Sequence, residues 1–265
     1  MARLLLGAAA LTAFAYVALC ALLFVLQRSM IYYPQPRGPA LPGTTALTLD
    51  AGGGARVEVT VRPSPSSESG APAVLYFGGN AEAVAYSLPE LATAFPDHAL
   101  YLMHYRGYGG SSGRPSEAAL VADALALHER VRAAHGARAG VVVVGRSLGS
   151  GVAVQLAAAR PREVARLVLV TPYDSLAALA ARFYPIFPVR WLLLDRYDSA
   201  QHAPQVDAPT LVVAAEHDDV IPRAHAEALA ARFRAGVATL HVVAGAGHND
   251  ISESPEYARL LQGLP

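Results

Sequence analysis

Short, continuous apolar runs alternate along this chain with longer, alanine-rich segments in which apolar residues recur with a helical period. The periodic segments predict helices, and the apolar runs predict buried strands, of which Val141–Val144 is typical of a central strand. Strands that alternate with helices form a mostly parallel sheet with helices on both faces, so the pattern predicts an α/β fold. The predicted strands are Ala73–Phe77, Ala99–His104, Gly140–Val144, Leu167–Val170, Thr210–Ala214 and Thr239–Val243. The predicted helices are Ala81–Phe95, Ser116–His135, Leu148–Arg160 and Arg223–Phe233.

Three early segments add to this pattern. The segments Ala46–Leu49 and Val57–Val61 predict a leading antiparallel hairpin. Proline, serine and glycine dominate Pro63–Gly70, and this composition predicts a surface loop between early strands.

The segment Pro172–Pro209 breaks the alternation of strands and helices. It is too long for a tight connection, and its aromatic cluster at residues 183–191 is too apolar for a solvated loop. Such a segment forms either a short helical cap over a site or a helix that covers the sheet. We expect the cap, over about residues 172–208.

The N-terminal segment predicts a membrane-spanning helix. Leu4–Leu26 holds no charged residue, and about 23 residues at roughly 1.5 Å each give about 35 Å, enough to cross a hydrocarbon core of about 30 Å. Arg3 and Arg28 flank the run, and Tyr32 and Tyr33 follow at the depth of a membrane interface. A cleaved signal peptide is the alternative, but the run is longer than a typical signal core and lacks a clear cleavage box.

We therefore expect an uncleaved single-pass anchor over residues 1–30, followed by one domain over residues 31–265. Charge does not decide the orientation, because arginines stand on both sides of the run. We take the extracytoplasmic side as the working expectation for the domain.

Composition excludes several classes of function. Hydrophobic residues make up 53% of the chain and charged residues 16%, so a large core is expected. The formal net charge is zero, which argues against a nucleic-acid partner. The chain contains no lysine, which rules out Schiff-base chemistry on a lysine. Its one cysteine, Cys20, allows neither an intrachain disulfide nor a cysteine-based zinc site. We expect neither a metal nor a cofactor, since the chain has no H-E-x-x-H motif or P-loop.

The pentapeptide Gly145–Gly149 has the form G-x-S-x-G, with Ser147 at its centre. Alone this motif is weak, but here a run of valines precedes it and an alanine-rich helix follows. A sharp strand-to-helix turn of this kind exposes the serine hydroxyl, and the two glycines let the turn close. Ser147 is therefore the candidate nucleophile.

A serine nucleophile needs a base, and in this arrangement the base comes last along the chain, after the final strand. His248 meets this requirement, because it lies in the glycine-flanked sequence that follows the last predicted strand. The other eight histidines lie in strands, in helices, in the candidate cap or beside the candidate acid. His248 is therefore the candidate base.

The acid that orients the base should follow the preceding strand. Asp218 and Asp219 both stand there, and Asp174 follows an earlier strand. We favour Asp218, which precedes by four residues the proline that opens the next helix, and we interpret Asp219 as a solvated or helix-N-terminal carboxylate.

A tetrahedral intermediate also needs two backbone donors for its oxyanion. The first candidate is the amide of Leu148, directly after the nucleophile, and the second is the amide of Asn80, in the glycine-rich loop after an early strand. Asn80 could also cap the following helix.

Together these motifs resemble the small, membrane-anchored α/β-hydrolase-domain proteins that include acyl-protein thioesterases and lysophospholipases. The resemblance runs from about Ile31 to the C-terminus, and Gly78 stands where those relatives commonly have histidine. It implies an α/β-hydrolase fold with a membrane anchor and a short cap. The matching pieces are Phe77–Ala81, Tyr105–Gly113, Gly145–Gly151, Thr171–Ser175 and Gly245–Asn249.

The leading hypothesis is a serine hydrolase that cleaves acyl esters or thioesters through an acyl-enzyme intermediate, with lipid-like or membrane-proximal substrates. A peptidase of the same fold is an alternative, although peptide selection usually needs an extra domain. A membrane-tethered scaffold without turnover is another, although a scaffold has no need for nucleophile, base and acid together.

Overall fold

Eight strands form one sheet in the order β1-β2-β4-β3-β5-β6-β7-β8, in a computed structural model that describes residues 1–65, 72–136 and 140–263. All six predicted strands are present, each with bounds that differ by at most two residues from the prediction. Residues 66–70 of the predicted surface loop lie outside the described residues. The strands are β1 (Thr45–Ala51), β2 (Ala55–Arg62), β3 (Ala73–Phe77), β4 (Ala99–Met103), β5 (Val141–Arg146), β6 (Arg166–Val170), β7 (Thr210–Ala215) and β8 (Ala238–Val243).

The sheet is mostly parallel, as predicted. Strands β1 and β2 form the expected antiparallel hairpin, with Leu47 opposite Val59, and β2 also runs antiparallel to β4. All pairings from β4 through β3, β5, β6 and β7 to β8 are parallel. The carboxyl ends of these strands therefore meet at one edge, where polar side chains from several loops come together.

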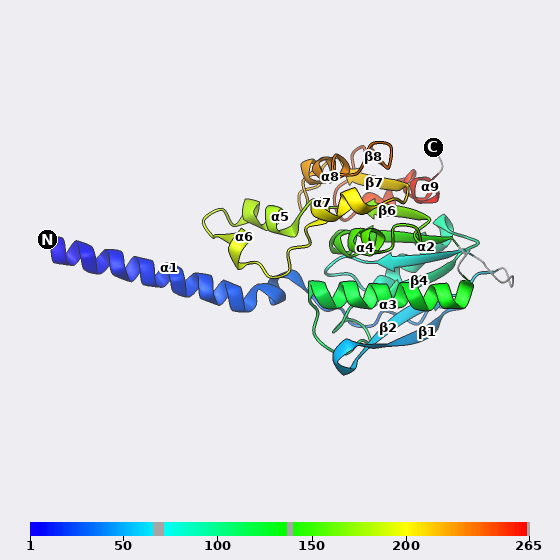
Figure 1. Cartoon of the computed structure of the whole chain (residues 1–265), viewed down its shortest axis with the longest axis horizontal. Helices are drawn as coiled ribbons and strands as arrows, with labels where there is room; N and C mark the ends of the chain where they lie inside the picture. The colour runs from blue at the N-terminus through cyan, green and yellow to red at the C-terminus, as the bar shows by residue number, and fades with distance from the viewer. Residues whose placement is uncertain (66–71, 137–139, 264–265) are drawn as a thin grey trace.

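Helices cover both faces of the sheet (Figure 1). Alternate residues of β3 show the division, because Leu75 packs with the core beneath α3 and α4 whereas Tyr76 packs with α2 and α9. These helices are α2 (Leu88–Ala94), α3 (Glu117–His135), α4 (Leu148–Ala159), α8 (Arg223–Ala230) and α9 (Tyr257–Gln262). Short 3-10 turns are η1 (Gly52–Gly54), η2 (Val84–Ser87), η3 (Ala203–Gln205) and η4 (Ile251–Glu253).

The predicted helix Ala81–Phe95 is wrong over its first half. Residues 80–81 form a turn, residues 82–83 are irregular, η2 follows, and the α-helix begins only at Leu88. Two features explain the later start. Pro89 lies in the first turn of α2, where proline favours the beginning of a helix. Before it, the Gly79 N–H and the Ser87 hydroxyl both donate to the carboxylate of Glu82, which holds these residues outside the α-helix. Helix α9 was not predicted at all.

The N-terminal helix α1 (Ala2–Ile31) extends away from the sheet for most of its length (Figure 1). By length and composition it is able to cross a membrane, and most of the side chains along it are exposed. Its last turns contact the rest of the protein, where Gln27 is buried.

Residues 171–209, here called the β6–β7 segment, connect two adjacent parallel strands. They contain α5 (Leu176–Phe183), α6 (Val189–Leu192) and α7 (Ser199–His202) as well as η3. In Figure 1, α5 and α6 lie on the side of the molecule from which α1 extends. The β6–β7 segment therefore stands at the carboxyl edge of the sheet, beside the N-terminal helix.

Candidate active site

The turn between β5 and α4 holds Ser147 in a strained backbone conformation, with φ 50° and ψ −118°. This region is rarely occupied by residues other than glycine and is common at functional sites. The Ser147 N–H donates to the Val170 carbonyl at 2.9 Å, and the Ser150 hydroxyl donates to the Ser147 carbonyl at 2.6 Å. The turn is thus fixed on both sides of the serine.

Both glycines of the pentapeptide are required because backbone atoms lie too close to them to leave room for a Cβ. A Cβ at Gly145 would lie 2.5 Å from the carbonyl oxygen of Gly149. A Cβ at Gly149 would overlap the carbonyl oxygen of Phe77, which belongs to the neighbouring strand β3. Only glycine lets α4 start this close to β3.

The structure brings Ser147, His248 and Asp218 together from three separate loops. His248 Nε2 lies 3.1 Å from Ser147 Oγ, and His248 Nδ1 lies 2.8 Å from Asp218 Oδ2. An ionised carboxylate only accepts hydrogen bonds, so Nδ1 carries the proton and Nε2 is free to accept the serine proton. All three side chains are buried. This geometry allows the imidazole to act as a general base on the serine hydroxyl.

The second oxygen of Asp218 is also occupied. Asp218 Oδ1 accepts the N–H groups of Val220 at 3.0 Å and Ile221 at 2.6 Å. These backbone donors hold the carboxylate plane, so the oxygen that faces His248 cannot rotate away.

The two alternative acids lie elsewhere. Asp219 is exposed to solvent. Asp174 binds His225 instead, at 2.6 Å from its Nδ1. Partial burial pushes the pKa of Asp174 upward, but the hydrogen bond and charge of His225 outweigh it and hold the pKa below its usual value. Asp174 and His225 thus form a separate pair.

Asn80 is held beside Ser147 by contacts with the end of α1. Its side-chain Nδ2 donates to the Ile31 carbonyl at 3.1 Å, and its own carbonyl accepts from the Tyr33 N–H at 3.1 Å and the Tyr108 hydroxyl at 2.6 Å. The side chain therefore does not cap the following helix. In the part of the chain that the structure describes, the N–H groups of Asn80 and Leu148 donate to no protein acceptor. Both residues line the same pocket as Ser147.

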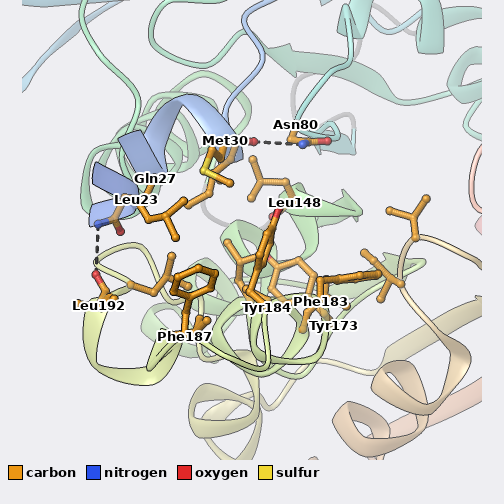
Figure 2. A pocket seen from close by; sticks show the side chains of 18 of the residues that line it. Leu23, Gln27, Met30, Asn80, Leu148, Tyr173, Phe183, Tyr184, Phe187 and Leu192 are labelled. Atoms are coloured by element: carbon orange, nitrogen blue, oxygen red, sulfur yellow. Dashed lines mark hydrogen bonds between the residues drawn. The ribbon is translucent and has the colours of Figure 1, made fainter. Parts of the chain in front are cut away.

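That pocket has a volume of about 250 Å³ and is mostly apolar (Figure 2). One wall comes from the last turns of α1, through side chains such as Leu23, Phe24 and Met30. The opposite wall comes from the β6–β7 segment and includes Phe183, Tyr184 and Phe187, which point toward the space in Figure 2. Ser147 lies in the lining together with these two walls, so an apolar group in the pocket reaches the candidate nucleophile.

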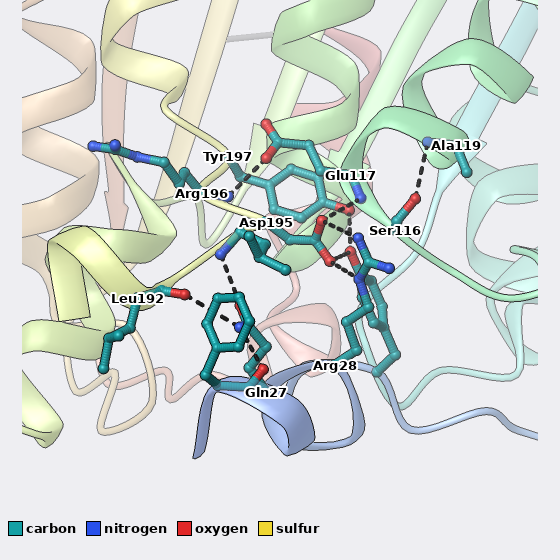
Figure 3. Close-up of polar contacts among 12 residues, drawn as sticks. Gln27, Arg28, Ser116, Glu117, Ala119, Leu192, Asp195, Arg196 and Tyr197 are labelled. Carbon is teal, nitrogen blue, oxygen red and sulfur yellow. Dashed lines mark hydrogen bonds and ion pairs between the residues drawn. The ribbon is translucent and has the colours of Figure 1, made fainter. Parts of the chain in front are cut away.

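Polar contacts join the two walls (Figure 3). Gln27 donates through Nε2 to the Leu192 carbonyl at 3.2 Å and accepts through Oε1 from the Leu194 N–H at 2.7 Å. Arg28 pairs with the buried Asp195 at 3.0 Å, and the Tyr32 hydroxyl donates to the same carboxylate at 3.1 Å. The position of α1 relative to the β6–β7 segment is therefore fixed by hydrogen bonds that are buried or partly buried.

A family model described as the alpha/beta hydrolase fold matches residues 72–203. An uncharacterised protein of Mycobacterium tuberculosis is 41% identical over 233 residues, which cover 84% of this chain and 81% of that protein. The chain belongs to the α/β-hydrolase family. The resemblance inferred from the motifs is thus confirmed.

Two animal relatives of the hydrolase match over a shorter region. Alpha/beta hydrolase domain-containing protein 17B of Homo sapiens is 32% identical over 62% of this chain and 54% of its own length. Alpha/beta hydrolase domain-containing protein aho-3 of Caenorhabditis elegans is 34% identical over 60% of this chain and 46% of its own. The hydrolase thus spans about half the length of each of these two proteins.

Solved structures share the fold of the hydrolase at low sequence identity. Est1E from Butyrivibrio proteoclasticus with bound ferulic acid gives a TM-score of 0.68 at 12% identity and covers 82% of this chain and 97% of its own. An esterase of Pyrococcus furiosus gives 0.70 at 14% identity and covers 88% and 97%. These likenesses establish the fold alone.

The motifs did not single out one partly buried carboxylate of the hydrolase, which lies beside the candidate oxyanion loop. Glu82 accepts the Gly79 N–H at 2.7 Å, the Tyr76 hydroxyl at 2.7 Å and the Ser87 hydroxyl at 2.6 Å. A Cβ at Gly78 would lie 2.9 Å from the Glu82 carboxyl carbon, so glycine at that position fits this loop. An acidic residue two positions after a Gly-Gly-Asn loop was the available sequence signal. We infer that Glu82 is a positioning residue for the Asn80 amide.

We expect Glu82→Gln to lower kcat by about tenfold to a hundredfold with little change in KM, because hydrogen bonds to a charged group contribute about 1.5–3 kcal/mol. Steady-state kinetics on a short acyl ester measure this effect. The exposed Glu253→Gln serves as the control and should match the native protein. An unchanged kcat in Glu82→Gln would show that the carboxylate plays no part in positioning.

In the described ranges, no group of three or more His, Cys, Asp or Glu residues is placed to hold a metal ion.

Proposed function

We propose that this hydrolase is a serine esterase or thioesterase that transfers an acyl group to Ser147 and then to water. The observation that carries the proposal is the hydrogen-bonded series from Ser147 Oγ to His248 Nε2 and from His248 Nδ1 to Asp218. A strained serine at the start of a helix adds support, since such a turn presents the hydroxyl to a substrate.

In the first half of the reaction, Ser147 Oγ attacks the acyl carbonyl carbon and His248 Nε2 takes the hydroxyl proton. The carbonyl oxygen becomes an oxyanion, which the amides of Asn80 and Leu148 stabilise. Collapse of this intermediate breaks the bond to the alcohol or thiol, which leaves with the proton from His248. In the second half, His248 deprotonates a water that attacks the acyl carbon, and the bond to Ser147 Oγ then breaks as His248 returns the proton to Oγ, so that a carboxylic acid leaves. Asp218 stabilises the charged imidazole in both halves.

We propose that α1 is a retained single-pass anchor rather than a cleaved signal, and that about residues 172–208 form a cap over the site. Cleavage after Phe24 would remove two residues that line the pocket, and cleavage after Arg28 would also leave the buried Asp195 without its ion-pair partner. We expect neither a nucleic acid nor a cofactor to take part in this reaction.

The retained anchor predicts that protein extracted from membranes carries α1. The intact mass of a detergent-purified sample should equal that of the full 265-residue chain, apart from removal of the initiator methionine. A mass that corresponds to a chain beginning near residue 22 or later would contradict the proposal.

A matched pair of substrates tests the proposed chemistry. An oxygen ester and a thioester of the same short acyl chain should both be hydrolysed by the full chain in detergent. Ser147→Ala should reduce both rates to near background. Hydrolysis that survives this substitution would overturn the proposal.

A further inference from the structure

Helix α1 provides part of the wall of the pocket beside Ser147. Leu23 and Phe24 line the pocket, and they stand within one turn of Leu26, where the charge-free run of the helix ends. Some of the lining side chains are themselves exposed, among them Phe24, Met30, Phe183 and Tyr184. The pocket therefore opens outward between α1 and the β6–β7 segment.

The β6–β7 segment also follows α1 toward its N-terminus. The Tyr16 hydroxyl donates to the Ile186 carbonyl at 2.7 Å, and the Tyr16 ring stacks on Phe187 with centroids 6.0 Å apart. Tyr16 precedes Gln27 by eleven positions, which places these contacts about 16 Å farther along the helix axis. If Leu4–Leu26 crosses the bilayer, Ile186 and Phe187 lie at the depth of Tyr16, near the middle of this run.

Residues 183–194 of the β6–β7 segment expose large apolar side chains, which favour contact with lipid over contact with water. Trp191 is 88% exposed and Ile186 is 70% exposed, and Phe183, Tyr184 and Leu194 are also exposed. An apolar cluster of this size next to a membrane-spanning helix marks a membrane contact. Arg182 directly precedes the cluster and Arg190 lies within it beside Trp191, and both arginines are exposed.

We propose that α1 forms one wall of the acyl-chain site and that a single acyl chain enters it sideways from the bilayer, through the opening between α1 and the β6–β7 segment. This inference rests on the proposed function and specifies its substrate as a membrane-borne acyl ester or thioester. A volume of about 250 Å³ is just below the usual range of ligand pockets, so it admits one chain rather than a complete two-chain lipid. The polar leaving group stays near Arg28, at the membrane surface.

Two adjacent leucines of α1 provide a matched test. Leu23 lines the pocket, whereas Leu22 is 52% exposed and is not among the lining residues. In phosphatidylcholine vesicles, Leu23→Trp should lower kcat/KM for a long-chain acyl ester by about tenfold or more relative to kcat/KM for a short-chain ester. Leu22→Trp should leave both values near those of the native protein.

The outcomes separate this inference from the proposed function. If both leucine variants give the same ratio of long-chain to short-chain activity as the native protein, α1 does not form a wall of the acyl-chain site. The proposed hydrolase chemistry is unaffected by that result. If the native protein hydrolyses neither ester, the proposed function itself fails. Should Leu23→Trp lose both activities, Leu23→Ala and Leu22→Ala repeat the comparison with a larger pocket, and only Leu23→Ala should then change the ratio.

Trp191 tests sideways access without any substitution, because it is the only tryptophan in the chain. In vesicles its emission should be shifted to shorter wavelength and quenched by phospholipids brominated on their acyl chains, but little affected by iodide. Quenching by iodide together with no effect of brominated lipid would place the β6–β7 segment in water and overturn the proposed route.

Discussion

Replacing His248 with alanine is expected to lower kcat for acyl ester hydrolysis by at least about a thousandfold, since it removes the group that accepts and returns the proton in the proposed reaction. His248 Nε2 is 3.1 Å from Ser147 Oγ, and the structure offers that hydroxyl no other base among the residues that it describes. Without the imidazole, Ser147 must attack as a neutral hydroxyl. Steady-state rates with a short acyl ester measure the loss.

His217→Ala is the matched control for this substitution. His217 stands next to Asp218 in the sequence, but its side chain is 70% exposed and lies 3.8 Å from the Glu216 carboxylate. It should keep the native kcat. Thermal unfolding of both variants checks that the fold is intact. A His248→Ala protein that retained kcat within about tenfold of native would contradict its role as the base.

The second large effect concerns stability, and it falls on Gly149. Gly149→Ala should lower the free energy of unfolding by at least about 3 kcal/mol, because the added Cβ meets the backbone of β3 rather than a movable side chain. For a domain of this size that loss corresponds to a decrease in Tm of about 6–12 °C. Thermal unfolding in detergent, followed by circular dichroism, measures it.

Gly140→Ala supplies the comparison. A Cβ at Gly140 would lie 3.5 Å from the Ala165 side chain, which is ordinary van der Waals contact. Its Tm should stay close to that of the native protein. Equal melting temperatures for the two variants would show that the turn around Ser147 can relax, against the account given for the pentapeptide.

The sheet was predictable because its strands are buried on both faces. Runs such as Val141–Val144 leave no polar side that would suggest another element, and β5 occupies that position at the centre of the sheet. Helix Ala81–Phe95 failed for a different reason. Its composition favours a helix, but the hydrogen bonds to the Glu82 carboxylate hold the chain in a turn until Pro89.

The candidate active-site residues were predictable because the strand order fixes where loops meet. Ser147, Asp218 and His248 each follow a strand whose carboxyl end lies at the same edge of the sheet. Only the three-dimensional structure distinguishes Asp218 from the alternatives Asp174 and Asp219. Asp174 pairs with His225, and Asp219 faces solvent.

The contacts of α1 could not be predicted from local sequence. Arg28 and Asp195 are separated by 167 positions, and neither residue follows a pattern that reveals its partner. An arginine after an apolar helix suggests a membrane interface, and an aspartate after three leucines suggests only the end of a helix. Their pairing depends on how the β6–β7 segment folds back onto α1, which tertiary packing alone decides.

The most direct test of the account is covalent labelling of the folded protein with a fluorophosphonate, followed by mass spectrometry of the modified peptide. We expect one phosphonylated residue, Ser147, in the native protein and no labelling of Ser147→Ala or of heat-denatured protein. Labelling of Ser147→Ala at the native rate, or a native protein that hydrolyses acyl esters without being labelled at Ser147, would contradict this expectation.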